Sequence, residues 1–200
     1  MQKLRIALPY VAILLGVITI GAGIFAIAEG ASAKSDVEDK LQDQNITLTE
    51  DAADIVEGAE PGAVVDTPDE AEQMANIINA HSLEASGGLT YSEMGRYATE
   101  DGDPAGTNDP EEAAVGPNGQ PLPNPARNTA FQAAALQTSL YSSFMGFKVA
   151  DFVQGFGLFA IAVGLFMIFA GVAFLGAAHA LFDNEGKNAK RPEPVPASTP

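Results

Sequence analysis

The chain has no cysteine and only two histidines among its 200 residues. Without cysteine there can be no disulfide, no thiolate nucleophile and no cysteine-ligated metal. The histidines, His81 and His179, are far apart, and the sequence has no nucleophile elbow, phosphate-binding loop or dinucleotide fingerprint. We therefore expect a protein that is not an enzyme, with no catalytic residues and no cofactor, in which His81 has a structural role.

Charge is missing from two long stretches. Residues 6–28 carry no formal charge, and within residues 152–182 only His179 can titrate. A helix rises about 1.5 Å per residue and crosses a hydrocarbon core of ~30 Å in about 20 residues. A segment in lipid must hydrogen-bond its own backbone, which favours helix. The sequence predicts an all-α membrane protein in which two transmembrane helices flank a small, mostly helical, partly irregular extracytoplasmic insert.

A cleaved signal sequence is the alternative for the first stretch. Basic residues precede it, and the sequence Ala-Ser-Ala at 31–33 resembles a cleavage site. The apolar core of a signal sequence usually has only ~7–15 residues. The longer stretch at 6–28 therefore favours an uncleaved membrane anchor.

The residues between the two stretches are strongly acidic. Positions 29–147 hold 22 acidic and 4 basic residues, a net charge of −18, against −16 for the whole chain. Basic residues gather near both ends of the chain. The positive-inside rule then predicts that both termini are cytoplasmic and that the insert lies outside the cell membrane. The acidic charge argues against nucleic acid as a partner and favours a cation or a basic protein surface.

These patterns divide the chain into six segments. We expect a cytoplasmic N-terminus (1–5), a first transmembrane helix (6–28), an acidic extracytoplasmic insert (29–123), a membrane-proximal helix (124–151), a second transmembrane helix (152–182) and a disordered cytoplasmic tail (183–200). The tail has four prolines and no apolar period, which is typical of disorder.

Two capping boxes predict helix starts within the insert. Thr67 and Glu70, with proline between them at the first helical position, begin a helix that Gly87 and Gly88 end. The second box, at residues 90–93, predicts a short helix to about residue 97. The insert has few apolar residues, so we expect a small helical cap that packs on the membrane-proximal helix or on a partner.

Asparagine and proline at 124 and 125 predict the start of the membrane-proximal helix. Its apolar face would hold residues 136, 140, 144 and 147. We expect it to run without interruption into the second span.

The loop at residues 101–112 partly matches a calcium-binding pattern. Four acidic residues fall at positions 1, 3, 9 and 12 of the helix–loop–helix calcium motif, namely Asp101, Asp103, Asp109 and Glu112. Ala105 offers no oxygen at position 5, and two prolines stiffen the loop. The alternative is a solvated acidic loop, and we expect no specific calcium site.

Small residues recur every seventh position in both spans. They include Gly16 and Gly23 in the first span and Gly157, Gly164 and Gly171 in the second. A seven-residue period keeps one seam of a helix facing its partner, and small residues let two backbones approach closely in lipid. We predict that these glycines pack the two spans into an antiparallel hairpin. The alternative is that glycine is simply common in membrane helices.

Large aromatic residues form a second series in the second span. Phe152, Phe159 and Phe166 each follow a seam position by two residues, which places them about 200° away on the helix, and Phe156 widens the ridge. This ridge is either a lipid-facing surface or a docking surface for a neighbouring membrane subunit. Neither span carries the buried acids or ion pairs of transporters and proton paths.

Two segments resemble a known family. Residues 75–93 (ANIINAHSLEASGGLTYSE) and 127–140 (RNTAFQAAALQTSL), followed by the glycine-rich span, resemble small actinobacterial two-span membrane proteins, many of which are labelled aromatic ring-opening dioxygenases. The resemblance covers about half of the chain, and no residue here supports dioxygenase chemistry. Some proteins of this kind are accessory subunits of the actinobacterial cytochrome bc–cytochrome oxidase supercomplex. The resemblance thus implies the cytochrome bc complex and cytochrome oxidase as partners, besides membrane lipid.

These observations lead to two functional hypotheses. The first is a non-catalytic accessory subunit of a larger membrane complex, namely a respiratory supercomplex in actinobacteria. The alternative is a self-standing cell-envelope protein that binds calcium or another cation through its acidic loop.

Overall fold

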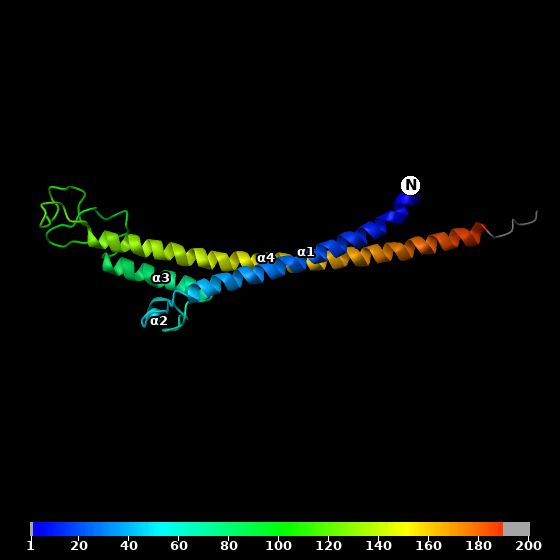
Figure 1. Ribbon diagram of the computed structural model, residues 1–200, viewed down its shortest axis with the longest axis horizontal. Coiled ribbons are helices and arrows are strands. Elements are labelled where there is room, and N and C mark those ends of the chain that lie inside the picture. Colours follow the sequence, from blue (N-terminus) through cyan, green and yellow to red (C-terminus); the bar gives the residue numbers. More distant parts are fainter. Residues whose placement is uncertain (1, 190–200) are drawn as a thin grey trace, which may run out of the picture. The chain divides into compact units, whose positions relative to one another are not determined.

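The fold is helical, in agreement with the predicted class. The computed structural model describes residues 2–189, with side chains for residues 7–177. Its ordered elements are α1 (Gln2–Gln42), α2 (Ala52–Ile55), α3 (Pro68–Ala85) and α4 (Pro125–Ala189), and this part of the chain contains no strand (Figure 1). The chain divides into two compact units, and α1 and α4 contribute to both. We call residues 1–30 with 152–200 the helix-pair unit, and residues 31–151 the insert unit.

Both long helices pass the length and composition requirements for crossing a membrane. The qualifying stretches are Ala7–Gln42 of α1 and Pro125–Ala177 of α4. Within the helix-pair unit most of their large apolar side chains are exposed. A surface of this kind suits hydrocarbon better than water, since no polar face relieves it.

The insert unit has a compact apolar core. Ile77 of α3 and Phe147 of α4 are among its most deeply buried side chains, together with Val65 from the connection before α3. The cluster also takes residues from all four helices and from the segments between them: Leu41, Leu48, Ala52, Ala59, Ala71, Ala75 and Leu140. The core that packs on the membrane-proximal part of α4 thus combines residues that precede α3, residues of α3 itself and residues of α4. Leu136, expected on the apolar face, is instead 55% exposed.

Helix α3 begins and ends as the sequence predicts. The Thr67 hydroxyl accepts a hydrogen bond from the Glu70 amide, and the Glu70 carboxylate accepts one from the Thr67 amide at 2.9 Å, which completes the capping box. At the other end Gly87 and Gly88 adopt positive φ. The Gly88 amide then reaches back to the Leu83 carbonyl at 2.7 Å, satisfying an otherwise unpaired helix-end acceptor.

The predicted short helix after residue 90 is wrong. Only one of the two capping hydrogen bonds forms: the Glu93 carboxylate accepts from the Thr90 amide at 2.8 Å, but the Glu93 amide donates to the Thr90 carbonyl instead of the Thr90 hydroxyl. The chain then turns at once. Tyr97 forms isolated antiparallel β-bridges with Thr107 and with Pro123. Gly95 packs against the Thr107 backbone so closely that a side chain there would clash. Packing of the segment on itself therefore overrides the local helix signal.

Both long helices continue past the limits of the predicted segments. Helix α1 extends beyond the predicted span of residues 6–28 to Gln42, because Val37 and Leu41 pack in the insert core and Lys34 pairs with Asp151 at 3.0 Å. Helix α4 continues to Ala189, so residues 183–189 are helical rather than disordered; residues 190–200 lie outside the described residues. The predicted start of α4 after Asn124, and its uninterrupted run into the second span, are confirmed.

Candidate functional site

The glycine seam of the helix-pair unit brings two backbones together. The carbonyl oxygen of Gly164 lies 2.6 Å from the point where a Cβ on Gly16 would stand, and the Gly16 carbonyl lies equally close to that point on Gly164. Gly23 and Gly157 form a second pair with the same reciprocal distance. No side chain larger than hydrogen fits at these points without backbone movement. The pairing order also makes α1 and α4 antiparallel within this unit.

Isoleucines fill the spaces that the glycines leave. The Cγ1 atoms of Ile168 and Ile20 lie 2.7 and 2.6 Å from the Cβ positions of Gly16 and Gly164, respectively. The second glycine pair is matched by Ile161 and Ile27 in the same way. Each helix therefore carries glycine and isoleucine four residues apart, repeated after seven. Sequence reasoning found the glycines but missed the isoleucines, although this spacing was visible in both spans.

Gly171 joins the same seam without a glycine partner. Its missing Cβ would meet Cγ1 of Ile13 at 2.7 Å and the Pro9 carbonyl oxygen at 2.9 Å. The structure thus brings all five predicted packing glycines to one helix–helix contact. Gly21 and Gly155, which lie off the seam, have open space at the Cβ position.

The predicted aromatic ridge is exposed in this chain. Phe152 and Phe166 are each 73% exposed, and Phe156 and Phe159 are 59% and 64% exposed. Three further exposed side chains extend the apolar face of α4 toward its C-terminal part, namely Phe169, Val172 and Phe174. Among the side chains of residues 7–30 and 152–177, α4 carries six exposed phenylalanines and α1 carries one, Phe25.

The carboxylates of the acidic loop accept hydrogen bonds from the backbone of the same loop. Asp101 accepts a hydrogen bond from the Asp103 amide, Asp103 from the Ala105 amide at 2.9 Å, and Asp109 from the Glu111 amide at 2.9 Å. Asp101 and Glu112 share one open hollow, whose lining does not include the other two candidates. No group of three or more potential metal ligands comes together within the described residues.

Hydrogen-bonding groups hold the pKa of two loop carboxyls below their usual range. The Thr99 hydroxyl, followed by the Asp103 amide, lowers the pKa of Asp101. The Thr90 hydroxyl and amide lower the pKa of Glu93. Both carboxylates stabilise turns in this way.

His81 pairs with an acid that sequence reasoning did not connect to it. Its Nε2 atom lies 2.7 Å from Oδ2 of Asp51, which sits just before α2. The Thr49 hydroxyl, and then His81, hold the pKa of Asp51 below its ordinary value. The pair fastens the α1–α3 connection to the side of α3.

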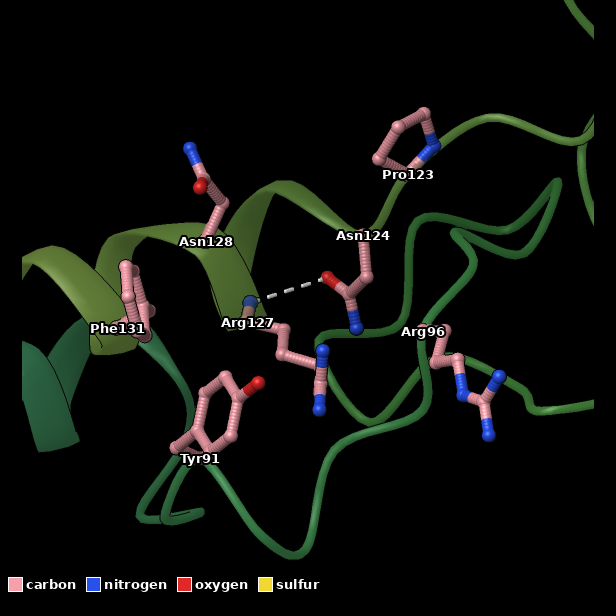
Figure 2. A pocket seen from close by; sticks show the side chains of 7 residues that line it. All are labelled: Tyr91, Arg96, Pro123, Asn124, Arg127, Asn128 and Phe131. Atoms are coloured by element: carbon pink, nitrogen blue, oxygen red, sulfur yellow. Dashed lines mark hydrogen bonds between the residues drawn. The ribbon is translucent and has the colours of Figure 1, made fainter.

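An arginine-lined hollow lies where α4 begins (Figure 2). The Arg127 guanidinium stacks on the Tyr91 ring, with Cζ 4.0 Å from the ring centre, and Phe131 lies beyond, its ring centre 5.9 Å from that of Tyr91. Arg96 lines the same hollow, which has a volume of about 270 Å³. Asn124 fixes the geometry: its side chain accepts from the Ala126 amide and donates to the carbonyls of Gly95 and Pro104.

Comparison with protein-family models, with curated proteins and with solved structures gives no match for this chain.

Proposed function

We propose that this protein is a non-catalytic accessory subunit of a larger integral-membrane complex. In this role it lies in the cell membrane with both termini in the cytoplasm and its acidic insert outside. The helix pair holds itself together through the glycine seam and offers its aromatic ridge to another subunit. The insert unit packs on the outer faces of the catalytic subunits.

The unequal distribution of phenylalanine carries the proposal. Lipid accepts any apolar side chain, so a purely lipid-facing pair needs no difference between its two helices. Here the exposed face of α1 is mainly aliphatic, whereas that of α4 is dominated by phenylalanine. Helices associate in lipid through van der Waals packing rather than hydrophobic transfer, and aromatic rings offer the largest packing surface. The asymmetry favours a protein neighbour on the α4 side.

The proposal of a respiratory complex rests on the resemblance of residues 75–93 and 127–140 to small actinobacterial two-span membrane proteins. That resemblance makes the cytochrome bc complex and cytochrome oxidase the proposed partners. The charge of the insert supports a role at a basic extracytoplasmic surface, because positions 29–147 carry −18. A self-standing cation-binding role has less support, since the candidate carboxylates of the acidic loop already accept hydrogen bonds from their own turns.

Purification through a C-terminal tag in a mild detergent tests the proposal. The wild-type protein should elute with haem-containing subunits, measured by cytochrome absorbance bands and by mass spectrometry. Replacing Phe159 and Phe166 by alanine should remove the partners, while replacing the similarly apolar Val17 and Ile18 on α1, 54% and 56% exposed, should keep them. Elution of the wild-type protein as a lone monomer would contradict the proposal.

A further inference from the structure

The hollow at Arg127 concentrates positive charge on an otherwise acidic insert. Only four basic residues occur at positions 29–147, and two of them, Arg96 and Arg127, line this one hollow. Lys34 already pairs with Asp151. Among the described residues, neither arginine guanidinium makes an ion pair or a hydrogen bond, although 22 acidic residues lie in the same segment. The arginines are thus unpaired in surroundings that offer many possible partners.

Burial makes the unpaired state of Arg127 more notable. Its Nε atom is buried and has no hydrogen-bond partner. A buried donor without an acceptor costs about 1–3 kcal/mol, and more when the group is charged. Stacking on Tyr91 also fixes the plane of the guanidinium, so its parallel N–H groups are preorganised for a bidentate acceptor.

The helix that begins at the hollow adds positive potential there. The first turn of α4 contains no acidic residue, whereas that of α3 contains Asp69 and Glu70. The N-terminus of a helix carries a partial positive charge and normally attracts acids. Arg127 in this turn adds to that positive potential, and an anion in the hollow would offset both.

One wall of the hollow is aromatic, formed by Tyr91 and Phe131, and the polar side chains of Arg96, Asn124, Arg127 and Asn128 line the rest together with Pro123. Phe131 is 58% exposed beside Tyr91. Tyr91 also lines a second hollow, of about 290 Å³, whose further lining combines apolar residues such as Leu83, Leu89 and Ala130 with polar ones such as Ser92 and Gln137. Two hollows that share one aromatic wall suit an extended ligand with an anionic group at one end and an apolar group beside it.

We propose that this double hollow binds a polypeptide segment of a partner protein, with an Asp or Glu carboxylate of that segment held by Arg96 and Arg127 and its neighbouring apolar side chain placed against Tyr91. Carboxylates match the arginine fork bidentately. A polyphosphate chain or an anionic lipid surface would be repelled by the −18 charge around the site, whereas a single carboxylate meets mainly the local arginines. This site lies in the insert unit and does not depend on docking through the aromatic ridge.

Selection from a random peptide library tests the proposal on the full-length protein in lipid nanodiscs. A displayed library of 12-residue peptides should yield sequences in which Asp or Glu stands beside an aromatic or aliphatic residue. Replacing that acid by its amide in a selected peptide should weaken binding about ten-fold or more, measured by fluorescence anisotropy.

Protein variants show whether the arginines hold the peptide. Arg96→Gln removes an exposed guanidinium that makes no hydrogen bond or ion pair within the described structure, so the fold should be kept while affinity falls about ten-fold. Arg127→Lys keeps the charge but loses the fork, and should also weaken binding. Lys40→Gln, which removes an exposed charge elsewhere in the insert, is the matched control and should bind as wild type. Absence of enriched acidic sequences, or equal binding by Arg96→Gln and wild type, would overturn the proposal.

Discussion

Gly16 and Gly164 are reciprocal partners: the carbonyl oxygen of each lies 2.6 Å from the Cβ position of the other. This relationship makes the hairpin sensitive to the smallest possible change. Gly164→Ala would place a methyl group against the backbone carbonyl of Gly16, which cannot move aside as a flexible side chain can. Overpacking of this kind costs about 1–3 kcal/mol. We expect a clear fall in the thermal unfolding temperature in detergent, and a larger fall for Gly164→Leu.

Controls for the seam lie on the same helices. Gly155→Ala on α4 and Gly21→Ala on α1 add the same methyl group in open space and should leave unfolding nearly unchanged. Phe159→Leu should also cost little, because Phe159 is 64% exposed. If Gly164→Ala melted at the same temperature as Gly155→Ala, the close contact would not exist in solution.

The glycine seam also shows which packing residues could be predicted from the sequence and which could not. The seven-residue spacing of Gly16 and Gly23 identifies a packing face, because this spacing can be read from one helix without knowing which helix packs against it. It does not identify Ile20 and Ile168, since isoleucine is an ordinary residue in an apolar span and only three-dimensional contact shows it filling a space. Helix ends were predicted where a cap acts locally, as at Thr67 and Asn124.

Predictions failed where tertiary packing overrode a local signal. Glu93 makes one of the two capping hydrogen bonds to Thr90, yet no helix follows, because Tyr97 pairs with Thr107 and Pro123. Helix α1 outlasts its apolar stretch because Leu41 is buried in the insert core. The arginine hollow was also missed: Arg96 and Arg127 are far apart in sequence, and only the fold of the intervening loop brings them to one place.

Membrane topology can be measured directly because the chain has no native cysteine. Single cysteines at Ser35, Ser92 and Ser198 would each be the only thiol in the protein. Both termini are predicted to be cytoplasmic, so an impermeant maleimide added to intact cells should label positions 35 and 92 but not position 198. Labelling of the three positions after cell lysis is the control for reactivity. Labelling at 198 without labelling at 92 would reverse the orientation.

The lowered pKa of Asp51, which the Thr49 hydroxyl and then His81 hold down, predicts a loss of stability in acid. The pKa of Asp51 is lowered in the folded protein from 3.8, so the unfolded chain binds the proton more readily. Its stabilising contribution is therefore fully present above pH 3.8 and is lost as the pH falls through the lower, folded value. Asp51→Asn should flatten the dependence of the unfolding temperature on pH between about 5 and 3.

The neighbouring Asp54→Asn is the matched control for this pH dependence, since the Asp54 carboxylate makes no hydrogen bond within the described residues. It should leave the pH profile as in wild type. An unchanged profile in Asp51→Asn would show that the Asp51 carboxylate contributes nothing measurable to the pH dependence of folding.

Calcium binding gives the last prediction, and calorimetry can test it. Asp101, Asp103 and Asp109 each accept a hydrogen bond from a nearby backbone amide, so each carboxylate is oriented by its own turn rather than toward a common point. Within the described residues no three potential ligands converge on one point. Carboxylates spread over a solvated loop attract cations diffusely, without fixed stoichiometry. Titration of the full-length protein with calcium at physiological salt should therefore show no saturable one-to-one isotherm. A saturable isotherm that Asp103→Ala abolishes would contradict this prediction and would favour the cation-binding role.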